Sequence, residues 1–155
     1  MAPSVLVVGF GNPLMGDDGV GLLVIELLKE LGVAPHVRLA EGGTDATVLA
    51  GLWQGEERVV LVDALVRGSP PGTIHRLSAE EVLQLPQPHR GVHALSLPEC
   101  LRWVLLAKPE LAKATVELFG VEPRQLEPGQ GLTPEVKAAA QQLARQLLQE
   151  LAPAP

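Results

Sequence analysis

The chain has 155 residues, of which 46% are hydrophobic, and a formal net charge of −6 at neutral pH. This length and apolar content fit one globular domain over residues 1–155 and argue against disorder. The acidic balance disfavours a nucleic-acid partner, because binding to phosphates needs a basic face. The single cysteine, Cys100, excludes an internal disulfide and suits the cytoplasm. The longest apolar stretch, Val20–Leu28, is interrupted by Glu26, and we expect no membrane segment.

Strands and helices are expected to alternate along the chain. Val5–Val8 is a continuous β-branched run that ends at Gly9, which is typical of a strand buried on both faces. The other expected strands are 36–40, 58–62, 73–77 and 115–119. The expected helices are 20–31, about 45–53, 96–107 and about 134–151. This alternation predicts a mostly parallel sheet that is covered by helices on both faces.

One connection breaks the parallel pattern. Between Asp63 and Thr73 only residues 64–72 remain, which are too few for a crossover helix. We therefore expect the strand that begins at Thr73 to run antiparallel near an edge of the sheet, with His75 as a solvated or edge residue.

Helix starts are marked by polar residues. Ser96 and Glu99 have the spacing of a capping box, and Thr133 is expected to cap the last helix. Thr44 or Asp45 can cap the helix that is expected to reach about residue 53.

The four aspartates carry the strongest functional signal. Each follows the C-terminal end of an expected strand, where open α/β sheets bind their ligands; they are Asp17, Asp18, Asp45 and Asp63. Asp45 reads as a helix cap. Adjacent carboxylates such as Asp17 and Asp18 repel each other, and a cation is the usual compensation. Asp63 ends an apolar strand, where a carboxylate costs stability unless it is paired or functional.

The loop after the first strand is rich in glycine but does not fit a dinucleotide. The third glycine of that fingerprint falls at position 14, which is Leu14. Asp17 and Asp18 would also meet a pyrophosphate with negative charge. We expect a cation here, and positive φ angles among Gly9, Gly11, Gly16 and Gly19.

His93 stands just ahead of the helix expected at 96–107, where it can lean over the strand ends. Its spacing alone leaves open whether it is a ligand. Cys100, inside that helix, reads as a small buried apolar residue. The sequence contains no familiar nucleophile constellation, so a hydrolase of this kind would use water activated by a metal or a carboxylate.

An ordered set of motifs extends over nearly the whole chain. It comprises Gly9–Gly21, Glu41–Thr44, Val62–Ala64 with Pro71–Thr73, His93–Leu97, Gly120–Pro123 and Leu126–Pro134. This set resembles the hydrogenase maturation proteases, endopeptidases that trim the C-terminus of nickel-iron hydrogenase large subunits.

The resemblance implies a three-layer α/β/α sandwich whose twisted, mostly parallel sheet has five strands, one of them antiparallel. It maps the metal-contacting positions onto Asp18, Asp63 and His93. Many family members have Glu at the first position, so Asp18 is one methylene shorter. The resemblance also implies an aspartyl-type endopeptidase, in which Asp17 or Asp63 orients or deprotonates the attacking water.

The implied partner is a hydrogenase large-subunit precursor that is already loaded with nickel, so that the substrate delivers the metal. We expect a cytoplasmic monomer with no nucleic-acid or membrane partner. Two alternatives stay open. One is a non-catalytic metal- or nucleotide-binding module, such as a nickel chaperone on the same fold. The other is a metal-dependent aminopeptidase, which needs more ligands, usually enough for two ions.

Overall fold

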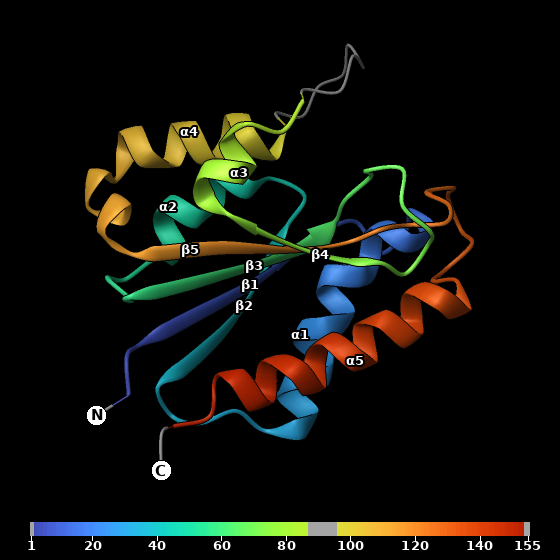
Figure 1. Ribbon diagram of the computed structural model, residues 1–155, viewed down its shortest axis with the longest axis horizontal. Helices are drawn as coiled ribbons and strands as arrows, with labels where there is room; N and C mark the ends of the chain where they lie inside the picture. Colours follow the sequence, from blue (N-terminus) through green and yellow to red (C-terminus); the bar gives the residue numbers. More distant parts are fainter. Residues whose placement is uncertain (1, 87–95, 154–155) are drawn as a thin grey trace.

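The computed structural model describes residues 2–86 and 96–153, and a twisted five-stranded sheet lies at its centre (Figure 1). The strands are β1 (Val5–Phe10), β2 (Val37–Gly43), β3 (Arg58–Ala64), β4 (Ile74–Ser78) and β5 (Thr115–Val121). Their order is β2-β1-β3-β5-β4. Neighbouring strands are parallel except for β4, which pairs antiparallel with β5 at one edge. The antiparallel edge strand that the short 64–72 connection predicts is therefore confirmed.

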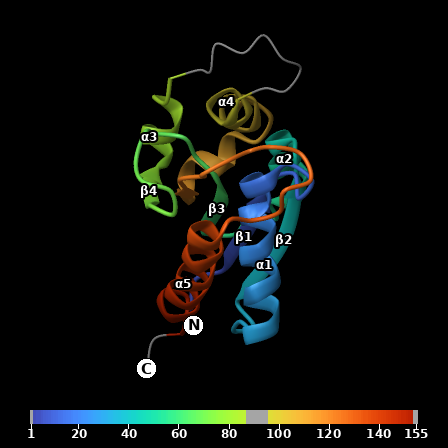
Figure 2. The same ribbon diagram turned by 90° about the vertical axis from the view of Figure 1, so that its right-hand side faces the viewer.

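Helices cover both faces of the sheet (Figures 1 and 2). On one face lie α1 (Val20–Leu31) and α5 (Pro134–Glu150). On the other lie α2 (Leu49–Leu52), α3 (Ala79–Leu83) and α4 (Leu97–Ala107). Short 3-10 turns complete the described chain: η1 (Gly16–Gly19), η2 (Ala46–Val48) and η3 (Pro109–Lys113). The three-layer α/β/α architecture is confirmed, and within the described residues no helix has the length and apolar character to cross a bilayer.

The strands divide their side chains between two cores, because successive residues of a strand point to opposite faces. In β3, Val60 and Val62 pack with α1 and α5. Val59 and Leu61 pack on the other face, with residues of α4. Burying each of these side chains contributes about 1.5–3 kcal/mol. Asp63 continues the Val59–Leu61 series, so the end of β3 directs this carboxylate towards the layer that contains α4.

Several local expectations are wrong in detail. Ser96 precedes α4 but makes no backbone cap, and its Oγ donates instead to a carboxylate oxygen of Glu99, at 2.9 Å. Thr133 precedes α5, but its hydroxyl bonds to Asp17 rather than to the helix. A capping box that we did not expect is present at Ser78 and Glu81, where it begins the short helix α3.

His75 is on edge strand β4, as expected, but it is not solvated. Its side chain is 13% exposed, and Nε2 lies 3.0 Å from Oε1 of Glu122. Burial makes ionisation of Glu122 harder. The bonds from His75 and from the backbone N–H groups of Arg67 and Ser69 outweigh burial and lower the pKa of that carboxyl. This buried network ties the loop that follows β3 to the end of β5.

Candidate functional site

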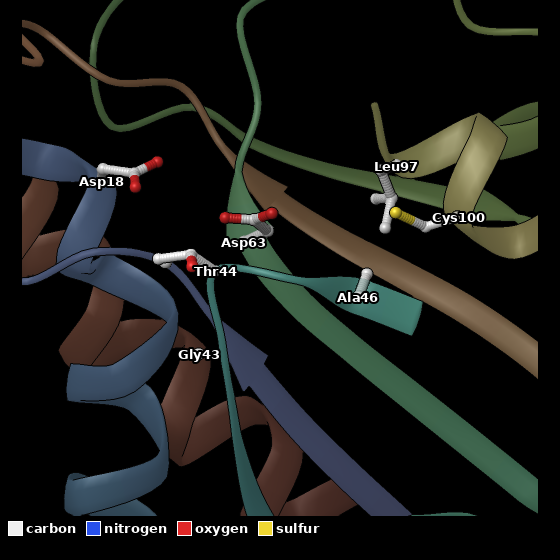
Figure 3. Close-up of a pocket in the computed structure, with 8 residues that line it drawn as sticks. Asp18, Gly43, Thr44, Ala46, Asp63, Leu97 and Cys100 are labelled. Atoms are coloured by element: carbon white, nitrogen blue, oxygen red, sulfur yellow. The ribbon is translucent and has the colours of Figure 1, made fainter. Parts of the chain in front are cut away.

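The candidate site lies where the strand order of the sheet changes direction. From β1 the chain goes through α1 to β2 on one side, and β3 then lies on the other side of β1. In open α/β sheets, ligands bind outside the carboxyl ends of the strands at such a switch point. A pocket of about 120 Å³ opens there. Its lining residues are Gly11, Asp18, Gly43, Thr44, Ala46, Asp63, Leu97 and Cys100 (Figure 3).

Asp63 lies at the centre of this pocket, near the end of β3 (Figure 3). Its side chain is partly buried, and the backbone N–H of Ala64 donates to Oδ1 at 2.8 Å. Burial is the main cause that raises the pKa of Asp63 to about 7. The negative charge of Asp18 raises it further, and the Ala64 hydrogen bond only partly opposes the two. At neutral pH this carboxyl is therefore balanced between its neutral and ionised forms.

Asp18 faces the same pocket from the η1 turn (Figure 3). The backbone N–H of Asn12 donates to its Oδ2 at 2.8 Å, which holds the carboxylate over the end of β1. The chain must fold back sharply to place Asp18 there. Gly11 has a φ of 138° and Gly16 a φ of 58°, conformations that side-chain-bearing residues rarely adopt. The expectation of positive φ angles in this loop is thereby confirmed at two of its four glycines.

Asp17 precedes Asp18 directly but points elsewhere. It is fully buried and is not among the residues that line the pocket. Its carboxylate accepts hydrogen bonds from the backbone N–H groups of Arg124, Gln125 and Thr133, at 2.8, 3.1 and 2.7 Å. The Thr133 hydroxyl adds another, at 2.9–3.0 Å. Backbone donors, rather than a cation, thus compensate the charge of Asp17, and the structure brings together Asp18 and Asp63 but not Asp17.

The end of the pocket away from Asp18 is lined by small and apolar side chains, those of Ala46, Leu97 and Cys100 (Figure 3). Burial raises the pKa of the Cys100 thiol above its usual range, although the backbone N–H of Ala46 opposes the rise. The expectation that Cys100 is buried is confirmed, but its place in the pocket was missed. The available signal was its position in the first turn of the helix that follows His93, which starts beside the strand ends.

The remaining predicted residues divide into two cases. Asp45 is a cap, as expected, because it accepts from the backbone N–H of Thr47 at 3.0 Å and from its hydroxyl at 2.6 Å. His93 lies outside the described residues. Within 2–86 and 96–153, no group of three or more His, Cys, Asp or Glu side chains is arranged to hold a metal ion. The described part of the candidate site is therefore a pair of carboxylates.

This pair is chemically suited to a divalent cation. Carboxylate oxygens are common ligands for such ions, and two of them leave coordination positions open. Asp18 and Asp63 repel each other across the pocket, and this repulsion adds to the effect of burial on the pKa of Asp63. A bound cation would relieve that repulsion.

Several known proteins resemble this chain over most of its length. The model of the hydrogenase maturation protease family matches residues 22–150. The hydrogenase 2 maturation protease of Escherichia coli strain K12 is 34% identical over 149 residues, which are 95% of this chain and 90% of that protein. The protein FrxA of Pyrococcus furiosus is 32% identical over 126 residues, or 81% of this chain and 88% of that protein.

Solved structures of hydrogenase maturation proteases also resemble this chain. The hydrogenase maturating endopeptidase HybD from Escherichia coli superposes with a TM-score of 0.79 at 31% identity, covering 96% of this chain and 91% of that one. The [NiFe] hydrogenase maturation protease HybD from Thermococcus kodakarensis superposes with a TM-score of 0.77 at 29% identity, covering 97% of this chain and 99% of that one. The sheet with one antiparallel strand is thus the architecture of these proteases.

Proposed function

The chain belongs to the hydrogenase maturation protease family, and from that premise we propose that it removes a C-terminal extension from a hydrogenase large-subunit precursor after recognising nickel in that precursor. The nickel is part of the substrate, which brings it to the pocket. We further propose that the enzyme acts in the cytoplasm, which its single cysteine suits. We also propose that it acts as a monomer, since one chain supplies both carboxylates of the pocket.

The observation that carries this proposal is the meeting of Asp18 and Asp63 in one pocket at the switch point of the sheet. Backbone N–H groups hold both carboxylates, that of Asn12 for Asp18 and that of Ala64 for Asp63. Oxygen ligands suit a borderline divalent ion such as nickel, and the two carboxylates leave positions for ligands from the substrate. His93, which the resemblance implies as a third ligand, remains part of the proposal.

Asp63 is the better candidate for activating water. Peptide hydrolysis needs a base that can reach a water molecule beside the scissile carbonyl and take its proton. The Asp63 carboxylate opens into the pocket, where such a water molecule and the scissile carbonyl would lie. The Asp17 carboxylate is already occupied by backbone donors. We therefore assign the water-activating role to Asp63 and none to Asp17.

The size of the pocket favours an extended peptide as substrate. A volume of about 120 Å³ is several times the minimum of about 10–15 Å³ that one water molecule needs by the same measure. It can admit a small side chain and a peptide group but not a folded element. The apolar end formed by Ala46, Leu97 and Cys100 would then border the residue beside the scissile bond.

The test is to incubate the protein with a nickel-loaded and a nickel-free precursor and to measure the mass of each large subunit over time. We expect the loaded precursor to lose its C-terminal extension and the nickel-free precursor to keep it. Equal cleavage of both would contradict the nickel-reading step but not the protease assignment. Tight binding of free nickel without cleavage of either precursor would favour the non-catalytic chaperone, which the family match does not.

A further inference from the structure

Asp17 is one of the three buried acidic residues in the described chain, together with Glu56 and Glu122, and it adjoins the candidate ligand Asp18. We infer that Asp17 is a positioning residue. It anchors the η1 turn to the 122–133 segment and so sets the reach of Asp18 into the pocket, without itself contacting metal, water or substrate. This inference rests on the function proposed above for Asp18 and Asp63.

The Asp17 carboxylate has no capacity left for chemistry. An ionised carboxylate offers about four acceptor positions. Arg124 and Gln125 donate their backbone N–H groups to Oδ2. Thr133 donates its backbone N–H to Oδ1, and its hydroxyl lies within bonding distance of both oxygens. Since the side chain is also fully buried, substrate could reach it only after these bonds broke.

Further contacts hold the start of the turn against the same segment. The backbone N–H of Asp17 donates to the carbonyl of Gln125 at 3.0 Å, so the bonding runs in both directions. Gly129 donates its backbone N–H to the carbonyl of Leu14 at 2.9 Å. A side chain at Gly16 would overlap the Gln125 carboxamide, which shows how closely the two segments pack. The η1 turn is therefore held by the 122–133 segment before, at and after Gly16.

This anchoring explains how two adjacent aspartates can have different roles. Successive side chains of a 3-10 turn point about 120° apart, because the turn has three residues per revolution. With Asp17 directed inward to the 122–133 segment, Asp18 is directed to the pocket, where Asn12 holds it. A rotation of the turn that released Asp17 would also move Asp18. The position of the candidate ligand is thus coupled to contacts of Asp17 that lie outside the pocket.

Glu122 provides a matched control. It is also a buried carboxylate, 3% exposed, and it accepts backbone N–H groups from Arg67 and Ser69 at 2.9–3.2 Å. It lies at the start of the 122–133 segment, but its side chain bonds to His75 and to the loop after β3, which carries none of the proposed ligands, and none of these bonds involves the η1 turn. Asp17→Asn and Glu122→Gln each place an amide nitrogen among backbone donors, so both should lower the melting temperature. Only Asp17→Asn should disturb Asp18.

The experiment compares unmodified protein with Asp17→Asn, Thr133→Val and Glu122→Gln at a temperature where all are folded. Ni²⁺ alone is titrated in and followed by the amide NMR signals of Gly11 and Gly43, which line the pocket. We expect Asp17→Asn to weaken Ni²⁺ binding and to lower kcat for the nickel-loaded precursor by about 10–100-fold, the usual effect of losing a group that orients a ligand. Thr133→Val should lower both to a smaller extent, and Glu122→Gln neither.

Four outcomes decide the matter. Normal Ni²⁺ binding together with a lowered kcat in the Asp17→Asn variant would overturn the inference, because Asp17 would then act directly in the reaction. Normal binding and kcat in both Asp17→Asn and Thr133→Val would also overturn it, leaving a purely structural role. If Asp17→Asn does not fold, the Ni²⁺ binding and kcat of Thr133→Val are compared with those of Glu122→Gln, and normal values in Thr133→Val would overturn the inference. If the unmodified protein cleaves no precursor, the proposed function fails, whereas the order of Ni²⁺ affinities still tests Asp17.

Discussion

Two groups of acidic side chains in this protein experience opposite electrostatic surroundings. In the pocket, Asp18 and Asp63 face each other, and burial together with this repulsion raises the pKa of Asp63. Across β3, β4, β5 and α5, Glu117 and Glu150 contact Arg58 and Arg76; these four residues form the arginine cluster. Burial opposes ionisation of Glu117 too, but hydrogen bonds and attraction from Arg76 and Arg58 lower its pKa. The two carboxylates of the pocket therefore repel each other, whereas the carboxylates of the arginine cluster are neutralised by positive charges.

The difference separates function from stability. A carboxylate pair without a counter-ion weakens the folded state, and a fold retains such a pair where a cation or a reaction uses it. Paired carboxylates like those of the arginine cluster stabilise the folded state as long as their partners remain. Substitutions in the two groups should therefore have opposite consequences for activity and for stability.

The largest expected effect is on processing. Asp63→Asn keeps the shape of the side chain but removes its charge and its ability to accept a proton. It should lower the rate of precursor cleavage by about 10²–10⁴-fold, as the loss of a catalytic base does. Glu117→Gln, the matched change in the arginine cluster, should leave cleavage within about twofold because it is remote from the pocket. Mass analysis of the precursor measures both, and near-normal cleavage by Asp63→Asn would refute the role of this carboxylate.

The second prediction concerns the backbone beneath Asp18. Gly11 and Gly32 both have positive φ, at 138° and 82°, so an alanine at either should cost about 1–2 kcal/mol. A Cβ at Gly11 would also overlap the backbone carbonyl oxygen of Asp18, so that the backbone would have to shift and the cost would be larger there, whereas a Cβ at Gly32 would meet nothing within 4 Å. Gly11→Ala should therefore lower cleavage by about 100-fold through a small displacement of Asp18.

Gly32→Ala, the control for this comparison, should lose stability alone. Thermal melts and cleavage rates of the two variants test the pair. Equal cleavage by both would show that the η1 turn tolerates displacement, against the geometry described for Asp18.

The third prediction is a pH dependence of opposite sign in the two groups. The folded-state pKa of Asp63 is raised from 3.8 to about 7. The folded state therefore binds this proton more strongly than the unfolded state, and stability falls as the pH rises from about 4 to 7. In metal-free buffer at pH 8, Asp63→Asn should have a higher melting temperature than the unmodified protein and an unfolding free energy that is larger by about 1–2 kcal/mol. Both gains should vanish near pH 4.

Glu117→Gln should show the reverse. Its carboxyl has a lowered pKa in the folded state, so its contribution to stability is present at neutral pH and is lost on acidification. The variant should melt lower at pH 7 and approach the unmodified protein below about pH 4. Melting curves across pH measure both differences, and a pH-independent difference for Asp63→Asn would contradict the raised pKa of Asp63.

Much of the fold was readable from sequence because it depends on local patterns. The apolar runs of β1 and β3 predict buried parallel strands, and the short 64–72 connection predicts the antiparallel edge strand β4. Helix α3 was missed because its five residues are too few to show a helical period. Thr133 has the composition of a cap, but a distant contact with Asp17 takes its hydroxyl.

The candidate site was readable only in part. The positions of Asp18 and Asp63 after their strands place both at the correct edge of the sheet. Their neighbour Asp17 has the same local sequence context, so no periodicity could distinguish it from Asp18. The groups that direct it inward lie 107 to 116 positions away. Such contacts follow from the packing of the 122–133 segment, which residue patterns along the chain do not encode.

The smallest expected effect lies within the arginine cluster. Arg76 bonds Glu117 through Nε and Glu150 through both Nη atoms, at 2.9–3.2 Å, and stacks over Phe119. Arg58 contributes less. Its Nη2 bonds Glu117 at 3.0 Å, while its Nε is buried without a hydrogen-bond partner among the described residues. A buried donor left unsatisfied costs stability.

Arg58→Lys removes that Nε and keeps a positive charge near Glu117, so the two changes should nearly cancel, within about 0.5 kcal/mol. Arg76→Lys cannot replace the forked contacts with two carboxylates and should cost more, about 1–2 kcal/mol. Urea unfolding of the two variants measures the difference. An Arg58→Lys variant as unstable as Arg76→Lys would mean that both arginines support the cluster equally, and that its stability comes from net charge rather than from the geometry of Arg76.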